Sequence, residues 1–215
     1  MSRLTTLHQL LEGPAGPLEA LIETPADFTG DCVAVVCHPH PLYGGAMTNK
    51  VVYTLSRAFQ ALGAETLRFN FRGVGKSAGA HDQGVGEVED TLAVIGAARE
   101  RHPGAALWLA GFSFGGMVAF LAAQRSDPHW LVTVAPALRR VPAASAHIAP
   151  PCPWLIVQGD KDELVSCAEI SGWASSLTPR PTLRVLAGGE HFFHGRLNEL
   201  QDIVIESAPG KEKPG

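Results

Sequence analysis

Cysteine is scarce in this sequence, and its spacing argues against several kinds of site. The 215 residues include four cysteines, and these are scattered along the chain. None forms a C-x-x-C pair or stands at the spacing of metal ligands. They are Cys32, Cys37, Cys152 and Cys167. We therefore expect buried or incidental thiols in a reducing compartment, and no metal site.

Excess charge, a signal peptide and a membrane span are also missing. The formal net charge is −4, which gives no reason to expect nucleic acid or an anionic membrane as a partner. The N-terminal residues lack the continuous apolar core of a signal peptide, and no apolar run approaches the length that crosses a bilayer. These absences predict a soluble, cytoplasmic protein. They leave the oligomeric state open, a homodimer included.

Short apolar runs that alternate with helix-like segments make up most of the chain. Residues 33–37 are an unbroken apolar run, as in a strand covered on both faces, and residues 48–62 carry apolar side chains at helical spacing. The same reading predicts strands at 4–11, 17–24, 33–37, 66–71, 106–112, 130–135, 154–158 and 182–187, and helices at 48–62, 86–101, 167–177 and 193–206, with one more ending near 125.

This alternation predicts an α/β fold in which a mostly parallel sheet lies in a three-layer α/β/α sandwich. No internal repeat is present, so we expect residues 1–207 to form a single domain. The tail, residues 208–215, is rich in proline, glycine and charge and is expected to be disordered. In such a sheet, ligands bind beyond the carboxyl ends of the strands.

Residues 107–118 read as a strand, a sharp turn and a helix, with Ser113 at the turn. The sequence around it, Gly-Phe-Ser-Phe-Gly, matches the G-x-S-x-G pattern of a nucleophile elbow. Steric crowding explains the glycines at positions 111 and 115, because the strand and the helix nearly touch at so tight a bend. The helix also directs its positive end toward Ser113. We therefore predict that Ser113 is a catalytic nucleophile.

A serine nucleophile needs a base, and the base needs an acid to orient it. In this architecture both follow the serine in the chain, the acid first. Asp160 and Asp162 lie just after the strand at 154–158; Asp162 reaches further over the sheet edge and is preferred, while Asp160 is expected to form the turn. His191 lies in the loop after the last strand and is the predicted base, whereas His194 is expected to cap or flank the final helix.

Backbone N–H groups must also stabilise the oxyanion that forms during acyl transfer. Phe114, the residue after the nucleophile, is expected to give the first. The second should come from the loop after residues 33–37, where Pro39 and Pro41 have no N–H to donate. His40 or Leu42 remains, and we prefer His40. The side chains of His38 and His40 are not expected to take part in the chemistry.

A glycine-rich loop, residues 73–79, imitates two nucleotide-binding patterns. It fits G-x-G-x-x-A, but the acid expected about 20 residues later at a strand end is absent. It also ends like a P-loop, but Asn70 replaces the first glycine. We read it as a tight turn beside the active site. Arg72 is then either structural or a substrate contact, and we list it with Leu42 and Tyr43 as candidate substrate-binding residues.

Taken in order, these motifs resemble the α/β-hydrolase fold, from about residue 16 to 206. The segments are His-Pro-His-Pro-Leu-Tyr-Gly-Gly, Arg-Phe-Asn-Phe-Arg-Gly-Val-Gly-Lys-Ser, Gly-Phe-Ser-Phe-Gly-Gly, Gly-Asp-Lys-Asp-Glu-Leu-Val and Gly-Gly-Glu-His-Phe-Phe. They are similar to the small, lidless bacterial branch close to dienelactone-hydrolase-like serine hydrolases. The resemblance implies an eight-stranded sheet with an antiparallel second strand, and Ser113, Asp162 and His191 as the triad. Dienelactone hydrolases use a cysteine nucleophile, so their substrate is not implied.

These observations predict a serine hydrolase that cleaves carboxylic esters or related acyl bonds of small-molecule substrates through an acyl-enzyme. The connection at residues 136–153 is too short and proline-rich for a helical lid, which favours small accessible substrates. No cofactor is expected, because the chain supplies the nucleophile, the base and the oxyanion donors. The alternatives are a serine peptidase or thioesterase on the same triad, and a non-catalytic binding module on the same scaffold.

Overall fold

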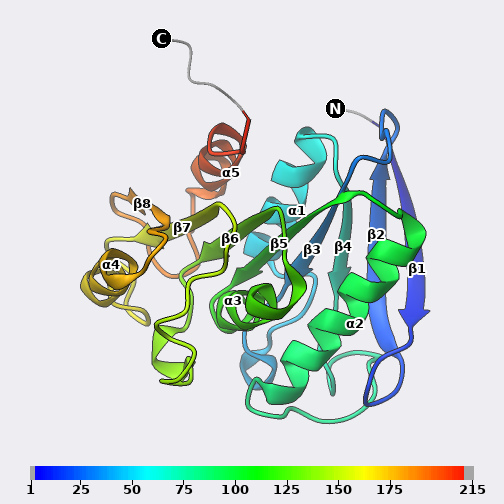
Figure 1. Ribbon diagram of the computed structural model, residues 1–215, viewed down its shortest axis with the longest axis horizontal. Helices are drawn as coiled ribbons and strands as arrows, with labels where there is room; N and C mark the ends of the chain where they lie inside the picture. Colours follow the sequence, from blue (N-terminus) through cyan, green and yellow to red (C-terminus); the bar gives the residue numbers. More distant parts are fainter. Residues whose placement is uncertain (1–2, 211–215) are drawn as a thin grey trace.

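The structure, a computed structural model, describes residues 3–210, and an eight-stranded sheet runs through it between two layers of helices (Figure 1). The strand order is β1-β2-β4-β3-β5-β6-β7-β8. β2 is antiparallel to both of its neighbours, and the remaining pairs are parallel. The strands are β1 (Leu4–Leu11), β2 (Leu18–Pro25), β3 (Cys32–Cys37), β4 (Glu65–Phe69), β5 (Ala106–Phe112), β6 (Trp130–Val134), β7 (Trp154–Gly159) and β8 (Thr182–Leu186). The predicted α/β-hydrolase architecture is confirmed.

The central strands are apolar throughout because helices cover both faces of the sheet. Along β3, Val33 and Val35 belong to one core cluster, and Ala34 and Val36 belong to the other. Successive side chains of a strand point to opposite faces, so a strand covered on both sides needs an unbroken apolar run. Residues 33–37 supply that run.

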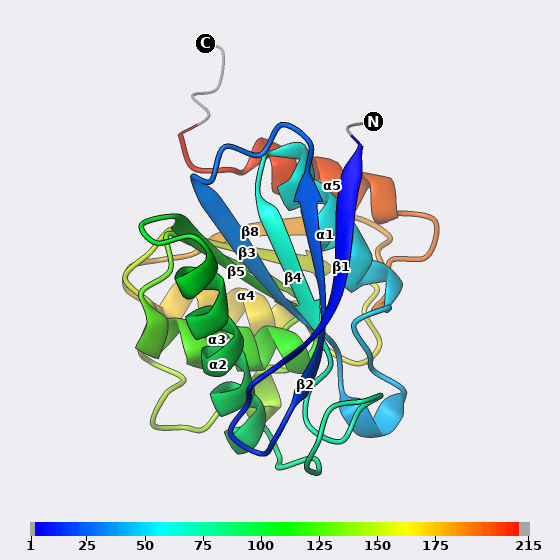
Figure 2. The same ribbon diagram turned by 90° about the vertical axis from the view of Figure 1, so that its right-hand side faces the viewer.

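Two helices pack on one face and three on the other, as the view along the sheet in Figure 2 shows for α1 and α5 against α2 and α3. α1 and α5 contribute to the core cluster that includes Ala34, and α2, α3 and α4 contribute to the cluster that includes Val33. The helices are α1 (Lys50–Ala61), α2 (Val85–Arg101), α3 (Phe114–Ser126), α4 (Cys167–Ser176) and α5 (Leu197–Glu206). The result is the expected three-layer arrangement.

The last helix begins later than the sequence suggested. We predicted a helix from residue 193, but α5 starts at Leu197. Phe193 and Gly195 have φ angles of 52° and 70°, which a right-handed helix does not contain. This turn places the side chain of Phe193 in the core, where it is fully buried. His194 therefore lies in the loop before α5, with its side chain 70% exposed.

The connection between β6 and β7 contains no helical lid. Residues 135–153 include one short 3-10 turn, η2 (Leu138–Arg140), followed by further turns. The side-chain amide of Gln124 on α3 donates to the carbonyl oxygens of Ser145 (3.1 Å) and Ile148 (2.6 Å), so this connection lies along α3. A second 3-10 turn, η1 (Pro41–Tyr43), follows β3.

At the other end of the chain, Ala208 is buried beside α5, and residues 211–215 of the predicted disordered tail lie outside the described residues. Among residues 3–210, no helix combines the length and the apolar character needed to cross a bilayer.

The carboxyl ends of β3 and β5 approach each other closely at Gly115, which lies in the first turn of α3. A Cβ atom at this position would clash with the carbonyl oxygens of Cys37 and His38. Both are backbone atoms, which cannot swing aside as a flexible side chain can. Gly115 therefore sets how close the elbow lies to the loop after β3.

We expect Gly115→Ala to destabilise the protein by roughly 1–3 kcal/mol, because the two segments must separate to admit a methyl group. Gly96→Ala is the matched control, since Gly96 is also helical and a Cβ there meets nothing within 4 Å. It should be stabilising by up to about 1 kcal/mol through helix propensity. Urea unfolding of both variants measures the difference, and equal stabilities would contradict this account.

Candidate active site

Ser113 occupies a strained turn between β5 and α3. Its φ is 56° and its ψ is −115°, a conformation rare for a residue with a side chain. The turn is held from outside: the Ser113 N–H donates to Val134 O (2.9 Å), and the Ala137 N–H donates to Ser113 O (3.0 Å). The flanking glycines make the bend possible, because a Cβ at Gly111 would clash with the backbone of Gly115. The hydroxyl is thereby fixed at the carboxyl edge of the sheet.

The structure brings Ser113, His191 and Asp162 into one hydrogen-bonded chain. His191 Nε2 lies 3.1 Å from Ser113 Oγ, and His191 Nδ1 lies 2.9 Å from Asp162 Oδ2. An ionised carboxylate can only accept, so Nδ1–H donates to Asp162 and Nε2 is left to accept from the serine hydroxyl. The imidazole is 2% exposed and packs against the ring of Phe112, with centroids 5.0 Å apart.

Asp162 is held as a carboxylate by its hydrogen bonds. Its Oδ1 accepts from the N–H groups of Leu164 (2.9 Å) and Val165 (2.7 Å). Burial would raise the pKa of Asp162, but the hydrogen bond from His191 and those from the two backbone N–H groups outweigh it. The pKa therefore lies below its ordinary value. A charged acceptor thus faces the imidazole at neutral pH.

Asp160 and Asp162 are separated by the path of the loop that carries them. Asp160 Oδ1 accepts from the N–H of Gly188 (2.6 Å), in the segment that leads to His191. A Cβ at Gly159 would clash with the carbonyl of Gly189, so the two loops touch at this point. Of the two candidates left by the sequence, Asp162 faces the imidazole and Asp160 ties the loops together.

Two polar residues that the sequence analysis passed over complete this arrangement. Gln158, at the buried end of β7, donates from Nε2 to Asp162 Oδ2 (3.0 Å) and to Val165 O (3.0 Å). Glu163 Oε2 accepts from the backbone N–H of His191 (3.4 Å). A signal for Gln158 was present, since it is the one polar side chain in the run Trp-Leu-Ile-Val-Gln-Gly.

The N–H groups of Phe114 and His40 lie free beside the elbow. Within residues 3–210 neither has a hydrogen-bond partner, whereas the N–H of Leu42 is directed to His40 Nδ1 (3.3 Å). The rings of His40 and Phe114 are in contact, with centroids 4.8 Å apart, so the two residues are neighbours. Of the two donors left open by the sequence, His40 has the available group.

His38 fastens the loop after β3 to the end of β4. Its Nδ1 donates to Pro39 O (2.6 Å), and its Nε2 accepts from the N–H of Phe71 (3.0 Å). The side chain is completely buried, and this burial lowers its pKa from 6.5 to about 4. His38 is therefore a neutral structural residue that positions the neighbouring His40.

The three predicted substrate contacts have different surroundings. Arg72 is engaged by Asp90 on α2: its Nε and Nη2 atoms donate to the two carboxylate oxygens, at 3.0 and 2.7 Å. The sequence left two roles for Arg72, and this paired guanidinium favours the structural one. Leu42 and Tyr43 lie on η1 beside His40 and are 68% and 81% exposed.

Burial disfavours the thiolate form of three of the four cysteines. Cys37 is fully buried, and burial raises the pKa of its thiol to about 12; burial also raises the pKa of Cys32 to about 12 and that of Cys152 to about 11. Among residues 3–210, no three or more side chains of histidine, cysteine, aspartate or glutamate gather as a metal-binding group.

Comparison with known proteins places this geometry among serine hydrolases. Residues 34–150 match the family model described as "Hydrolase_4: Serine aminopeptidase, S33". An uncharacterised protein of Rickettsia prowazekii (strain Madrid E) is 33% identical over 201 residues, which are 89% of this chain and 84% of that protein.

Two solved structures share the whole fold. An α/β serine hydrolase homologue from Coxiella burnetii is 41% identical, with a TM-score of 0.88 over 96% of this chain and 97% of that chain. An α/β serine hydrolase without a lid from Xanthomonas campestris is 37% identical, with a TM-score of 0.89 over the same shares of the two chains. The absence of a lid in residues 135–153 agrees with the second structure.

The buried imidazole of His38 lets us predict how the stability of the protein changes with pH. Its pKa of about 4 in the folded protein lies below 6.5, so the unfolded chain takes up the proton first as the pH falls. The stability that His38 contributes is complete above pH 6.5 and is lost toward pH 4, by about 1.4 kcal/mol per pH unit. NMR titration of the folded protein, with a His38→Gln variant for assignment, should give a neutral His38 at pH 5.5. A midpoint near 6.5 would contradict this.

Proposed function

The chain belongs to the hydrolase family described as serine aminopeptidase, S33, and we propose that it hydrolyses carboxylic esters or related acyl compounds through Ser113, His191 and Asp162. It is a serine hydrolase of the α/β-hydrolase fold without a lid. The proposal concerns the roles of the three side chains and the kind of bond that is cleaved.

In the proposed reaction Ser113 Oγ attacks the acyl carbon while His191 Nε2 takes the hydroxyl proton. The negative charge that develops on the carbonyl oxygen is met by the N–H groups of Phe114 and His40. The imidazolium then gives its proton to the leaving alkoxide, and an acyl-enzyme remains. A water molecule then attacks the acyl-enzyme in the same way, with His191 again as the base, and the carboxylic acid is released.

The hydrogen-bonded chain from Asp162 through His191 to Ser113 carries this proposal. Its two distances, 2.9 and 3.1 Å, are within direct proton-transfer reach, and all three residues lie at one edge of the sheet. A binding module that had lost its chemistry would keep the scaffold without needing this alignment. The alignment therefore favours an enzyme over a non-catalytic module.

Small, accessible substrates suit the open site. The short connection of residues 135–153 leaves no helical cap over Ser113, so the far end of a long acyl chain would find no wall to cover it. Each methylene that does become buried contributes only about 0.8 kcal/mol. We expect short acyl groups to be cleaved with the best kcat/KM.

A peptidase is the second candidate, because the family description names serine aminopeptidases. The same triad would attack an amide, and a thioester differs only in its leaving group. Parallel assays of a p-nitrophenyl ester, an acyl thioester and an aminoacyl p-nitroanilide discriminate the three. Our proposal expects the ester to be cleaved with the highest kcat/KM.

Replacement of the nucleophile tests the proposal most directly. Ser113→Ala should fold, fail to react with a fluorophosphonate probe and lose ester hydrolysis, because no other side chain is placed to attack. Mass spectrometry should find the probe on Ser113 of the wild-type chain. Wild-type hydrolysis by the variant, or a probe attached to another residue, would overturn the assignment.

The two neighbouring aspartates make a matched pair. Asp162→Asn should lower kcat by roughly 10³–10⁴-fold, because the amide no longer holds the imidazole in the tautomer that accepts the serine proton. Asp160→Asn should mainly lower the melting temperature, since Asp160 accepts a loop N–H and does not contact His191. Steady-state kinetics and thermal unfolding of both variants separate these effects. The opposite pattern would transfer the role to Asp160.

A further inference from the structure

Two small cavities flank η2 on either side of the elbow. The first, the α2–α3 cavity, measures about 230 Å³ and lies between the start of α2, the outer side of α3 and residues 140–145. The second, the η2–α4 cavity, measures about 190 Å³ and is lined by η2, Leu164, Val165 and Glu169. Arg140, the last residue of η2, lines both. It is the residue that the two cavities share.

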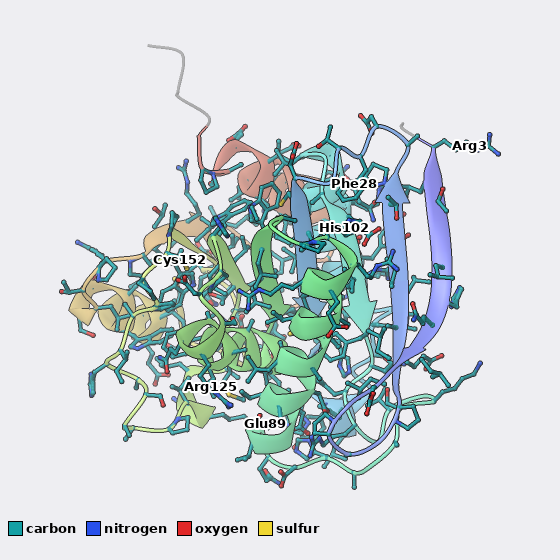
Figure 3. The ribbon with its side chains drawn as sticks, turned by 45° about the vertical axis from the view of Figure 1, so that its right-hand side comes forward. Arg3, Phe28, Glu89, His102, Arg125 and Cys152 are labelled. Carbon is teal, nitrogen blue, oxygen red and sulfur yellow. The ribbon has the colours of Figure 1, made fainter. Side chains whose placement is uncertain are left out.

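Arg140 is the uncompensated charge of this region. The other arginines that line the cavities are paired: Arg139 donates to Glu169 (2.6 Å), and Arg125 is bonded to Glu89. Figure 3 labels Glu89, on α2, and Arg125, near the end of α3, next to each other. Across the described part of the chain, Arg140 has neither an ion pair nor a hydrogen bond through its side chain, and it is exposed.

The α2–α3 cavity lies beside the helix that follows the elbow: Met117 lines it, and the Met117 N–H donates to Ser113 O (3.1 Å). A Cβ built at Gly84, in the cavity wall, would lie 2.9 Å from Met117 Cε and 3.8 Å from the ring of Phe114. Phe114 follows the nucleophile and is a proposed oxyanion donor. The cavity floor is apolar, formed by Val88, Met117 and Leu121. An acyl group at Ser113 that extends along α3 would meet this apolar surface.

Arg140 stands close to the same centre. The N–H of Ala137, at the start of the turn, donates to Ser113 O (3.0 Å), which ties η2 to the elbow. The N–H of Arg140 in turn donates to Ala137 O (2.9 Å), so Arg140 lies one turn from the residue that contacts the elbow. Arg140 is thus near the elbow and also lines the cavity with the apolar floor.

We propose that Arg140 binds a carboxylate at the far end of the acyl group, so that the substrates are half-esters of short dicarboxylic acids. This deepens the proposed function and depends on it. A guanidinium presents a fork of N–H donors that matches a carboxylate, whereas a single cation leaves about one charge of a phosphate monoester unbalanced. The cavity of about 230 Å³ is below the roughly 300 Å³ at which pockets for larger ligands begin, so the chain is short.

The experiment compares two esters that differ in one charge. The charged substrate is the mono-p-nitrophenyl ester of adipic acid, and the neutral one is its methyl ester. The quantity measured is the ratio of their kcat/KM values, corrected for spontaneous hydrolysis. Wild-type enzyme should prefer the charged ester, and the preference should shrink at high salt.

Arg140→Gln and Arg139→Gln form the matched pair, because the two side chains are adjacent and only Arg139 is already paired. Arg140→Gln should lower the charged-to-neutral ratio by about two- to fivefold, the range of an exposed charge pair. Arg139→Gln should leave the ratio unchanged. A ratio unaffected by Arg140→Gln, or lowered equally by both variants, would overturn the proposal.

The outcomes also separate this proposal from the proposed function. Hydrolysis of both esters without a charge preference supports the esterase and rejects the role of Arg140. If neither ester is cleaved and the fluorophosphonate does not label Ser113, the proposed function fails. Binding of monomethyl adipate, measured by calorimetry, then still tests the anion site: Arg140→Gln should weaken it by about two- to fivefold, and a smaller change rejects the site.

Discussion

Close contact between backbones at the carboxyl edge of the sheet is the constraint on which the rest of the site depends. Gly115 touches the carbonyls that end β3, Gly159 touches Gly189 in the loop before His191, and Gly45 touches Pro39. Each contact leaves no room for a Cβ atom. The first contact holds the elbow after β5 against the end of β3, the second joins the loops after β7 and β8, and the third folds the loop after β3 onto itself. Main-chain contacts therefore hold the loops that carry the reactive groups.

Around this frame, two buried carboxylates of α2 are paired with groups of the neighbouring loops. Glu87 is buried and accepts from His81 and from the N–H groups of Asp82 and Gly84, which fixes the segment beside Phe114. Asp90 is also buried and accepts hydrogen bonds from the backbone N–H and the guanidinium of Arg72. A buried charge without a partner would be costly, so these pairs keep the loops in one arrangement. Arg140 is the contrast, since its side chain is exposed and has no ion pair in the described part of the chain.

The sequence predicted most of the fold and the members of the hydrogen-bonded chain, because these depend on local patterns. Apolar periodicity locates the strands, and the glycines around Ser113 report a tight turn whatever the distant contacts. Asp160 and Asp162 could not be separated with certainty, because both lie in one turn and the loop path decides which reaches His191. Gln158 was missed although its partners, Asp162 and Val165, lie within seven residues of it, whereas Arg140 was missed because α2 and α3, which form the walls of its cavity, are distant in the chain. The predicted start of α5 was wrong because the identity of Phe193 does not indicate the positive φ angle that this residue adopts.

The order of the parts along the chain has a consequence for synthesis. His40 lies after β3 and Ser113 after β5, whereas His191 follows β8, 78 residues beyond the serine. A ribosome-bound chain that has extended as far as β6 thus holds the proposed nucleophile and oxyanion donors but lacks its base. Such a fragment has a serine of ordinary, low reactivity. In the proposed mechanism, hydrolysis therefore begins only after the last quarter of the polypeptide, which carries Asp162 and His191, has emerged and docked onto the sheet.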